Sequence, residues 1–171
     1  MHRPATRPAL FALVLAAQFS VDAPAMDDSP QSITVLGAPN QRLASGSAAL
    51  EAGRFEEGIR LSLAGLDDVA STHDQAAGHA NVCAGYAALK RWNEALPHCN
   101  RSLELDRGNW RAFNNRAAVY VGLKLLDLAQ TDVDAGLALA PDSRILRKTR
   151  EVVKEHRAAE KRDRRKRPVR A

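Results

Sequence analysis

Two cysteines and two histidines are the residues of this 171-residue chain whose types could support metal or redox chemistry. His79 precedes Cys83 by about one helical turn, and His98 is the direct neighbour of Cys99. Thiolates and imidazoles bind zinc, but structural zinc sites use closely spaced ligand pairs such as CxxC, which this chain lacks. Adjacent residues of a helix also point to different faces, which separates His98 from Cys99. The sequence therefore predicts no metal site and no cofactor.

Catalytic motifs are also missing from the sequence. It contains no glycine-rich phosphate loop, no GxSxG, no HExxH, and no Ser/His/Asp set in a recognisable context. The chain is 45% hydrophobic and only 5% aromatic, a composition that suits an alanine- and leucine-rich helical protein of one domain. We therefore expect no enzymatic activity and a role in binding.

Two asparagines, Asn81 and Asn115, are 34 residues apart and are the leading candidates for recognition. A side-chain amide is both donor and acceptor, so it can pair with a peptide backbone whatever the side chains of that peptide. The surrounding chain repeats at the same interval, because the following pairs match: Ala84 and Ala118, Tyr86 and Tyr120, Lys90 and Lys124, Ala95 and Ala129, Leu103 and Leu137, Leu105 and Leu139. This period indicates stacked helical units that leave an extended surface free for a partner.

The recurring residues resemble those of the tetratricopeptide repeat family, over residues 39–143. The last copy matches at Phe113, Ala117, Tyr120, Ala129 and Pro141, and the middle copy at Val82, Cys83, Tyr86, Lys90, Trp92, Glu94, Ala95 and Leu103. A weaker first copy, offset by 37 residues, aligns at Gly46, Phe55, Glu57 and Leu66, with three extra residues in the turn 67–74. The resemblance implies an all-α, right-handed superhelical solenoid.

The expected domain organisation is three helix–turn–helix repeats, at residues 39–72, 76–109 and 110–143. Small residues recur where the two helices of a repeat must approach closely, and Asn93 is expected to cap the second helix of the middle repeat so that Pro97 does not break it. Residues 144–160 have a narrow apolar stripe and should form a helix that caps the open end of the last repeat. The core is expected to contain Phe55, Trp92, Leu103, Leu105, Leu137 and Leu139.

The resemblance places a peptide-binding groove along the first helix of each repeat. Its expected lining is mostly small: Leu43, Ser47, Leu50, Ala77, Asn81, Ala84, Ala88, Arg111, Asn114, Asn115, Ala118 and Gly122. Among these, the expected peptide contacts are Ser47, Asn81, Arg111, Asn114 and Asn115. The alternative is that the asparagines bond only to neighbouring helices.

Some members of the family clamp a free C-terminal carboxylate with five Lys, Asn or Arg side chains. Here only Asn81 and Arg111 fit that pattern, because Leu43, Ser47 and Asn115 stand at the other three positions. We therefore expect no strong preference for a free C-terminus. Arg111 still favours an acidic side chain in the ligand.

Cys83 and Cys99 fall at inward positions on the two helices of the middle repeat. In an oxidising compartment a disulfide between them would stabilise the fold, by roughly 3 kcal/mol in the entropic model. The alternative is two buried thiols that are too far apart or badly aimed to bond. The sequence leaves both readings open.

The N-terminus has the pattern of a secretory signal at residues 1–25. Two arginines precede the apolar run 9–17, and Ala23-Pro24-Ala25 fits a cleavage site. The alternative is an uncleaved anchor, but the run falls short of the roughly 20 residues that span a membrane. We therefore expect an exported protein, periplasmic or secreted, in which residues 26–38 form a disordered linker or an extended segment docked on a neighbour.

Charge divides the rest of the chain into an acidic and a basic part. Residues 26–143 hold 10 Lys and Arg against 15 Asp and Glu, whereas residues 144–171 hold 13 against 4. The tail 161–171 is almost free of apolar residues and is expected to be disordered. It is either a solvated tail or a site for an anionic membrane surface or polysaccharide, through Lys161, Arg162, Arg164, Arg165, Lys166 and Arg167. Nucleic acid is disfavoured, because this tail has no aromatic residue to stack on bases.

The sequence thus predicts a non-catalytic interaction scaffold that holds an extended peptide or a partner helix in its groove. Two alternatives come from other classes. In the first, the basic tail is the functional part and binds a polyanion. In the second, the chain is an assembly subunit that uses the convex face or the ends of the solenoid. The sequence identifies neither the partner nor the oligomeric state.

Overall fold

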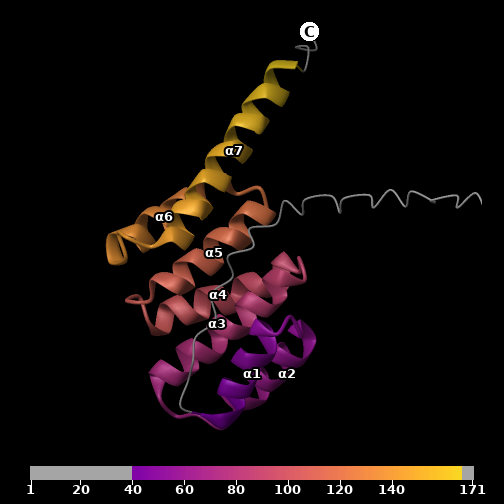
Figure 1. The fold of residues 1–171 in the computed structure, drawn as a ribbon, viewed down its shortest axis with the longest axis vertical. Coiled ribbons are helices and arrows are strands. Elements are labelled where there is room, and N and C mark those ends of the chain that lie inside the picture. The colour runs from indigo at the N-terminus through magenta and orange to yellow at the C-terminus, as the bar shows by residue number, and fades with distance from the viewer. Residues whose placement is uncertain (1–39, 167–171) are drawn as a thin grey trace, which may run out of the picture.

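A computed structural model describes residues 40–166 as seven α-helices without a strand (Figure 1). The helices are α1 (Gln41–Glu51), α2 (Phe55–Leu66), α3 (Thr72–Ala88), α4 (Trp92–Leu105), α5 (Trp110–Gly122), α6 (Leu126–Leu139) and α7 (Arg144–Lys166). The expected all-α solenoid is confirmed. The expected signal sequence 1–25 and linker 26–38 lie outside the described residues, as does the end of the tail from residue 167.

The helices pair in chain order into three repeats, α1–α2, α3–α4 and α5–α6, which stack along the long axis of the molecule (Figure 1). The first helices of the repeats also contact one another, α1 with α3 and α3 with α5, and α7 packs on α5 and α6. The inner layer is therefore α1, α3, α5 and α7, and the outer layer is α2, α4 and α6.

The helices of the inner layer begin at side-chain caps. The Asn40 carboxamide oxygen accepts from the backbone N–H groups of Arg42 and Leu43, at 2.9 and 3.2 Å. Ser71 and Asn109 cap α3 and α5 in the same way. A capping side chain satisfies a backbone donor that has no partner inside the helix, so these residues fix where each repeat starts.

The turn inside each repeat has one geometry. Gly53, Lys90 and Lys124 take φ values of 75°, 58° and 60°, and their N–H groups donate to the carbonyls of Leu50, Ala87 and Val121. The N–H of the next residue donates to a carbonyl five residues earlier, which completes a Schellman motif. The turn therefore ends each first helix at the same place.

The two helices of the first repeat approach closely at Gly46. A Cβ added there would lie 3.0 Å from the Ser62 backbone nitrogen and 3.1 Å from the Gly58 carbonyl oxygen. Only glycine permits this spacing without a shift of the outer helix. The core continues through Cys83, Ala95, Cys99 and Val119 and through Ala117, Ala129, Val133 and Val153.

Several local expectations were wrong. Helix α3 begins at Thr72, so part of the expected turn 67–74 is helical. Helix α4 begins at Trp92 with Arg91 as its N-cap, which leaves Asn93 without a capping role and puts Pro97 inside the helix. Leu139 is 46% exposed and does not belong to the core, whereas Leu103 is buried.

Helix α7 is longer than expected and extends past α6 (Figure 1). It continues to Lys166, so residues 161–166, expected in a disordered tail, are helical. Its apolar stripe packs Leu146 and Val153 onto the last repeat, as a capping helix should. None of the described helices is long and apolar enough to cross a membrane.

Candidate functional site

The candidate site is the inner face, defined by Ser47 on α1, by Ala77, Asn81 and Ala84 on α3, and by Asn115 and Ala118 on α5. On α3 and α5 these residues recur at helical spacing, so they share one side of each helix. Asn81 and Asn115 hold the same position in adjacent repeats. Their amides and the short side chains around them are suited to a chain that runs across several helices.

The inner face is not open to solvent. The exposed fraction is 0% for Asn81, 1% for Asn115 and 6% for Ser47. The alanines around them are buried as well, because Ala77, Ala84 and Ala118 are at most 2% exposed. Ser47, Asn81 and Asn115 all have interaction partners, as buried polar groups generally do. The sequence predicted an accessible groove, so this burial is an unexpected property of the site.

Asn114 does not lie on the inner face with the other two asparagines. Its amide oxygen accepts a hydrogen bond of 2.8 Å from the Thr149 hydroxyl of α7, and both side chains are buried. The amide oxygen of Asn114 is therefore occupied by the capping helix, contrary to the expected role of this residue in peptide contact. The residue joins the capping helix to the last repeat.

Three further positions of the expected lining pack between helices. Leu43 reaches Gly65 of α2 and Gly78 of α3, and Leu50 reaches Gly58 of α2. Gly122 lies directly under the Trp92 ring of α4. These residues determine how close the helices come and are not available to a ligand.

Arg111 is half-buried at the start of α5, one helical turn before Asn115. Its guanidinium carbon lies 4.5 Å from the centre of the Trp110 ring, a cation–π contact that restrains the side chain. The backbone N–H of Arg111 donates to the capping Asn109. The site therefore has a positively charged side chain at the N-terminal end of α5.

Cys83 and Cys99 form a disulfide between α3 and α4, with their Cα atoms 5.1 Å apart. Both residues are fully buried beside Ala87, Ala95 and Val119. The bond joins the two helices of the middle repeat and does not reach the inner face. The sequence left open whether these cysteines form a disulfide or stay as two buried thiols, and the structure contains the disulfide.

His79 and His98 meet next to this disulfide, with their Nδ1 atoms 3.0 Å apart. Burial lowers the pKa of His79 from 6.5 to about 4, with the neighbouring His98 and Arg101 adding to the effect and Glu104 opposing it. Burial also lowers the pKa of His98, whose ring lies 6.0 Å from that of Tyr86. Among the described residues, no group of three or more His, Cys, Asp or Glu side chains is placed to hold a metal ion.

The histidine pair predicts a stability that depends on pH. Because the folded state lowers both pKa values, the unfolded chain binds more protons between pH 6.5 and about 4, and the free energy of unfolding falls as the pH drops through this range. We expect the His79→Gln/His98→Gln double variant to lose less stability than the native chain over the same range. Urea titrations at pH 7.5, 6, 5 and 4 measure this. Parallel curves for the two proteins would contradict it.

An ion pair between Arg116 of α5 and the buried Asp132 of α6 was not predicted from the sequence. The Nε and one terminal nitrogen of Arg116 donate to the two carboxylate oxygens, each at 2.8 Å, and the other donates to Asn100 of α4 at 3.0 Å. The Asp132 side chain is 4% exposed and that of Arg116 is 21% exposed. The middle repeat has Val82 and His98 at these positions, so the repeat pattern contains no signal for the pair.

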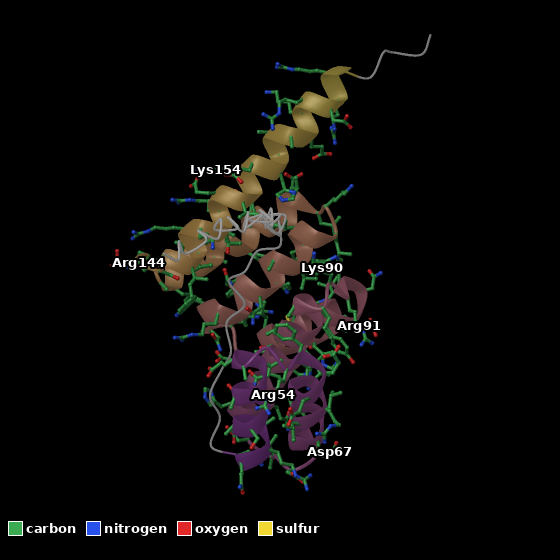
Figure 2. The ribbon with its side chains drawn as sticks, turned by 45° about the vertical axis from the view of Figure 1, so that its right-hand side comes forward. Arg54, Asp67, Lys90, Arg91, Arg144 and Lys154 are labelled. Carbon is green, nitrogen blue, oxygen red and sulfur yellow. A yellow bond between two sulfur atoms is a disulfide. The ribbon has the colours of Figure 1, made fainter. Side chains whose placement is uncertain are left out.

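The expected polyanion site lies partly on α7. Lys161, Arg162, Arg164 and Arg165 are exposed there, and Arg164 donates to Glu160 at 2.7 Å. The side chain of Lys166 and the whole of Arg167 lie outside the described residues. Figure 2 shows charged side chains over the outer surface of the stack, including Arg144 and Lys154 on α7. The basic helix and the inner face are thus separate parts of the molecule.

No family model matches the chain. A relative, sperm-associated antigen 1 of Mus musculus, is 31% identical over 110 residues, which are 64% of this chain and 12% of that protein. The chain therefore spans about an eighth of the length of this relative.

Solved structures resemble the fold more completely. The first tetratricopeptide repeat domain of human RPAP3 superposes with a TM-score of 0.64 at 22% identity, over 71% of this chain and 93% of that domain. The first such domain of Spaghetti (RPAP3), bound to the HSP90 peptide SRMEEVD, gives 0.59 at 23% identity, over 67% and 91%. The period of 34 residues, the stacked helix pairs and these likenesses together show that the described residues have the fold of a tetratricopeptide repeat domain.

Proposed function

We propose that this protein is a non-catalytic scaffold that binds an extended segment of a partner protein on its inner face. The observation that carries the proposal is the equivalent placement of Asn81 and Asn115 on adjacent inner helices, within a surface of alanines. Two amides one repeat apart can each pair with a backbone unit of one extended chain. The short neighbouring side chains let that backbone come close.

The Spaghetti (RPAP3) domain with its HSP90 peptide supports a peptide as the class of ligand. This chain has only two of the five residues of a carboxylate clamp, Asn81 and Arg111, so a free C-terminus is not required. Arg111 lies at the edge of the inner face and favours an acidic side chain in the peptide. The proposed ligand is therefore an internal or terminal peptide segment whose acidic residue binds near Arg111, at the N-terminal end of α5.

The compartment is part of the proposal. We propose that the protein is exported, on the basis of the signal-like residues 1–25. The Cys83–Cys99 disulfide supports an oxidising environment, since such bonds persist mainly outside the cytosol.

The test is capture of partner proteins by the chain 26–171 and by an Asn81→Ala/Asn115→Ala variant, from an envelope fraction, with a peptide array in parallel. Loss of two amide hydrogen bonds, at about 1 kcal/mol each, should weaken peptide binding about 30-fold, and the cost of the unpaired backbone groups adds to this loss. The matched control is Asn93→Ala, which changes an exposed asparagine on α4. Equal binding by the variant and the control would overturn the proposal.

The exposed basic residues of α7 favour a second candidate, attachment to an anionic surface. Replacement of Lys161, Arg162 and Arg165 by glutamine should release the protein from vesicles with anionic lipids, and 0.5 M salt should do the same because the attraction is electrostatic. If this variant, and not the asparagine pair, lost its captured partners, the basic helix would be the primary site. Vesicle binding that survived both changes would exclude this candidate.

A further inference from the structure

We propose that two copies of this chain form a two-fold symmetric dimer through the surface between the start of α6 and the end of α7. The inference goes beyond the proposed function, because no residue of this surface belongs to the inner face. Its starting point is that α7 extends past α6 and leaves the stack (Figure 1). Every residue from 157 to 165 is exposed, and a polar helical segment without a packing partner is only marginally stable in water.

Two adjoining hollows, of about 550 and 330 Å³, lie between this end of α7 and the start of α6. They form one surface, the α6–α7 cleft, because both are lined by Lys124, Leu126, Glu160 and Arg164. In the smaller hollow, Arg157 of α7 forms an ion pair with Asp127 of α6. This pair holds the two walls together, so the cleft has its shape within a single chain.

The cleft is bordered by exposed leucines. Leu125 is 43% exposed and Leu128 is 47% exposed, and both line the smaller hollow. They are two of the four large hydrophobic side chains that are exposed among the described residues, and the other two, Leu63 and Leu139, line neither hollow. Single exposed leucines are ordinary, whereas neighbouring ones beside a hollow are typical of a protein contact site.

The charges of the cleft identify the kind of partner. Three cations and three anions line it, which are Lys124, Arg157, Arg164, Asp127, Glu160 and Asp163. Helix α7 as a whole, in contrast, has 11 Lys and Arg against 4 Asp and Glu. An acidic or a basic partner would require a surplus of the opposite sign in the cleft. A balanced surface is instead complementary to a second copy of itself.

The shape of the surface leads to the same partner. At a two-fold axis each contact occurs twice with its two residues exchanged, so the acids of the cleft can pair with its own bases. The exposed leucines and the larger hollow lie side by side, so Leu128 of one copy can enter the hollow of the other and receive the reciprocal contact. Such an interface closes on itself and yields a dimer and not a filament.

Dimerisation leaves the other binding surfaces free. Lys161, Arg162 and Arg165 line neither hollow, so they stay available for an anionic surface. A dimer has two inner faces and two basic helices, and a partner with repeated sites would therefore bind both copies at once and dissociate more slowly.

The test is sedimentation equilibrium of the chain 26–171, which retains every described residue. We expect the mass to rise from one chain to two between about 5 and 500 µM, since the contact is small. Leu125→Asp/Leu128→Asp should weaken the association at least ten-fold, because it would bury two carboxylates in the contact. The matched control, Leu63→Asp/Leu139→Asp, changes two leucines of similar exposure elsewhere and should leave the association unchanged. Equal association of the two variants would disprove the placement of the contact.

Charge reversal tests the two-fold arrangement independently of the leucines. Lys124→Glu/Arg164→Glu makes the cleft acidic, and Glu160→Lys/Asp163→Lys makes it basic. Each variant alone should stay monomeric, because like charges meet across the axis. An equimolar mixture should dimerise at concentrations at which neither variant does, and a mixture that stays monomeric contradicts the proposal.

The native chain itself provides the remaining outcomes. A mass of one chain at every concentration refutes the dimer. A mass that grows beyond two chains indicates a head-to-tail contact, which also refutes the two-fold form. Replacement of Lys161, Arg162 and Arg165 by glutamine should leave the dimer intact, and loss of the dimer in that variant would place the contact on the basic side of α7 instead.

Discussion

Replacement of Asp132 by alanine is expected to lower the free energy of unfolding by about 3 kcal/mol, because it leaves the partly buried guanidinium of Arg116 without its carboxylate partner. Asp132 is buried and accepts two hydrogen bonds of 2.8 Å from Arg116. Arg116 also donates to Asn100, so the pair connects α4, α5 and α6. The measurement is urea denaturation followed by circular dichroism at pH 7.

The matched control for this variant is Asp134→Ala on the same helix. Asp134 is exposed and accepts a hydrogen bond from Gln130, a contact between exposed groups whose loss should change stability by less than about 0.5 kcal/mol. A double variant, Arg116→Met/Asp132→Leu, removes both charges and should recover most of the lost stability. If Asp132→Ala and Asp134→Ala were equally stable, the ion pair would have no structural importance.

Removal of the disulfide by Cys83→Ala/Cys99→Ala is expected to cost about 3 kcal/mol, the entropic value for closing a loop of this length. The bond closes a separation of 16 residues between the helices of the middle repeat. Without it the unfolded chain gains conformational freedom, while the folded repeat loses two buried sulfur atoms. Thermal melting of the native chain and of the variant, each with and without a reductant, measures the effect.

The reductant provides the internal control. It should lower the melting temperature of the native chain and leave that of the double-alanine variant unchanged. Two free thiols found by labelling the unfolded, non-reduced native chain would contradict the bond itself.

The repeat architecture could be predicted from the sequence because its signal is local and recurrent. Tyr86 and Tyr120, like Ala95 and Ala129, recur at equivalent positions where the two helices of a unit pack. The first unit lacks the tyrosine, and its helices still pair, because Gly46 lets them approach closely. A period is thus visible even where one unit departs from the pattern.

The positions that could not be predicted depend on contacts between units. Asn114 looks like a groove residue until Thr149, 35 residues later, takes its amide oxygen. Leu139 has the spacing of a core residue but is the last residue of α6 and is exposed there. Arg116 and Asp132 pair in one repeat only. None of these facts appears in a comparison of the repeats with one another.

The extent of some helices also could not be predicted from local sequence rules. Pro97 lies in the sixth position of α4, where a proline would ordinarily disturb the helix, yet the helix continues to Leu105. The packed partner α3 holds α4 in place through the disulfide and the surrounding core.

The Schellman turns imply where the molecule can bend. Lys90 and Lys124 occupy a backbone region that disfavours a side chain, and two hydrogen bonds keep each of them there, so the two helices of a repeat move as one body. The packing between α4 and α5 is less extensive than that inside the middle repeat. The joint between the first and middle repeats is also more extensively packed, so of the two joints between repeats we expect the one between the middle and last repeats to bend more easily. Such bending changes the distance between Asn81 and Asn115, and with it the spacing of backbone groups that the two amides can hold at once.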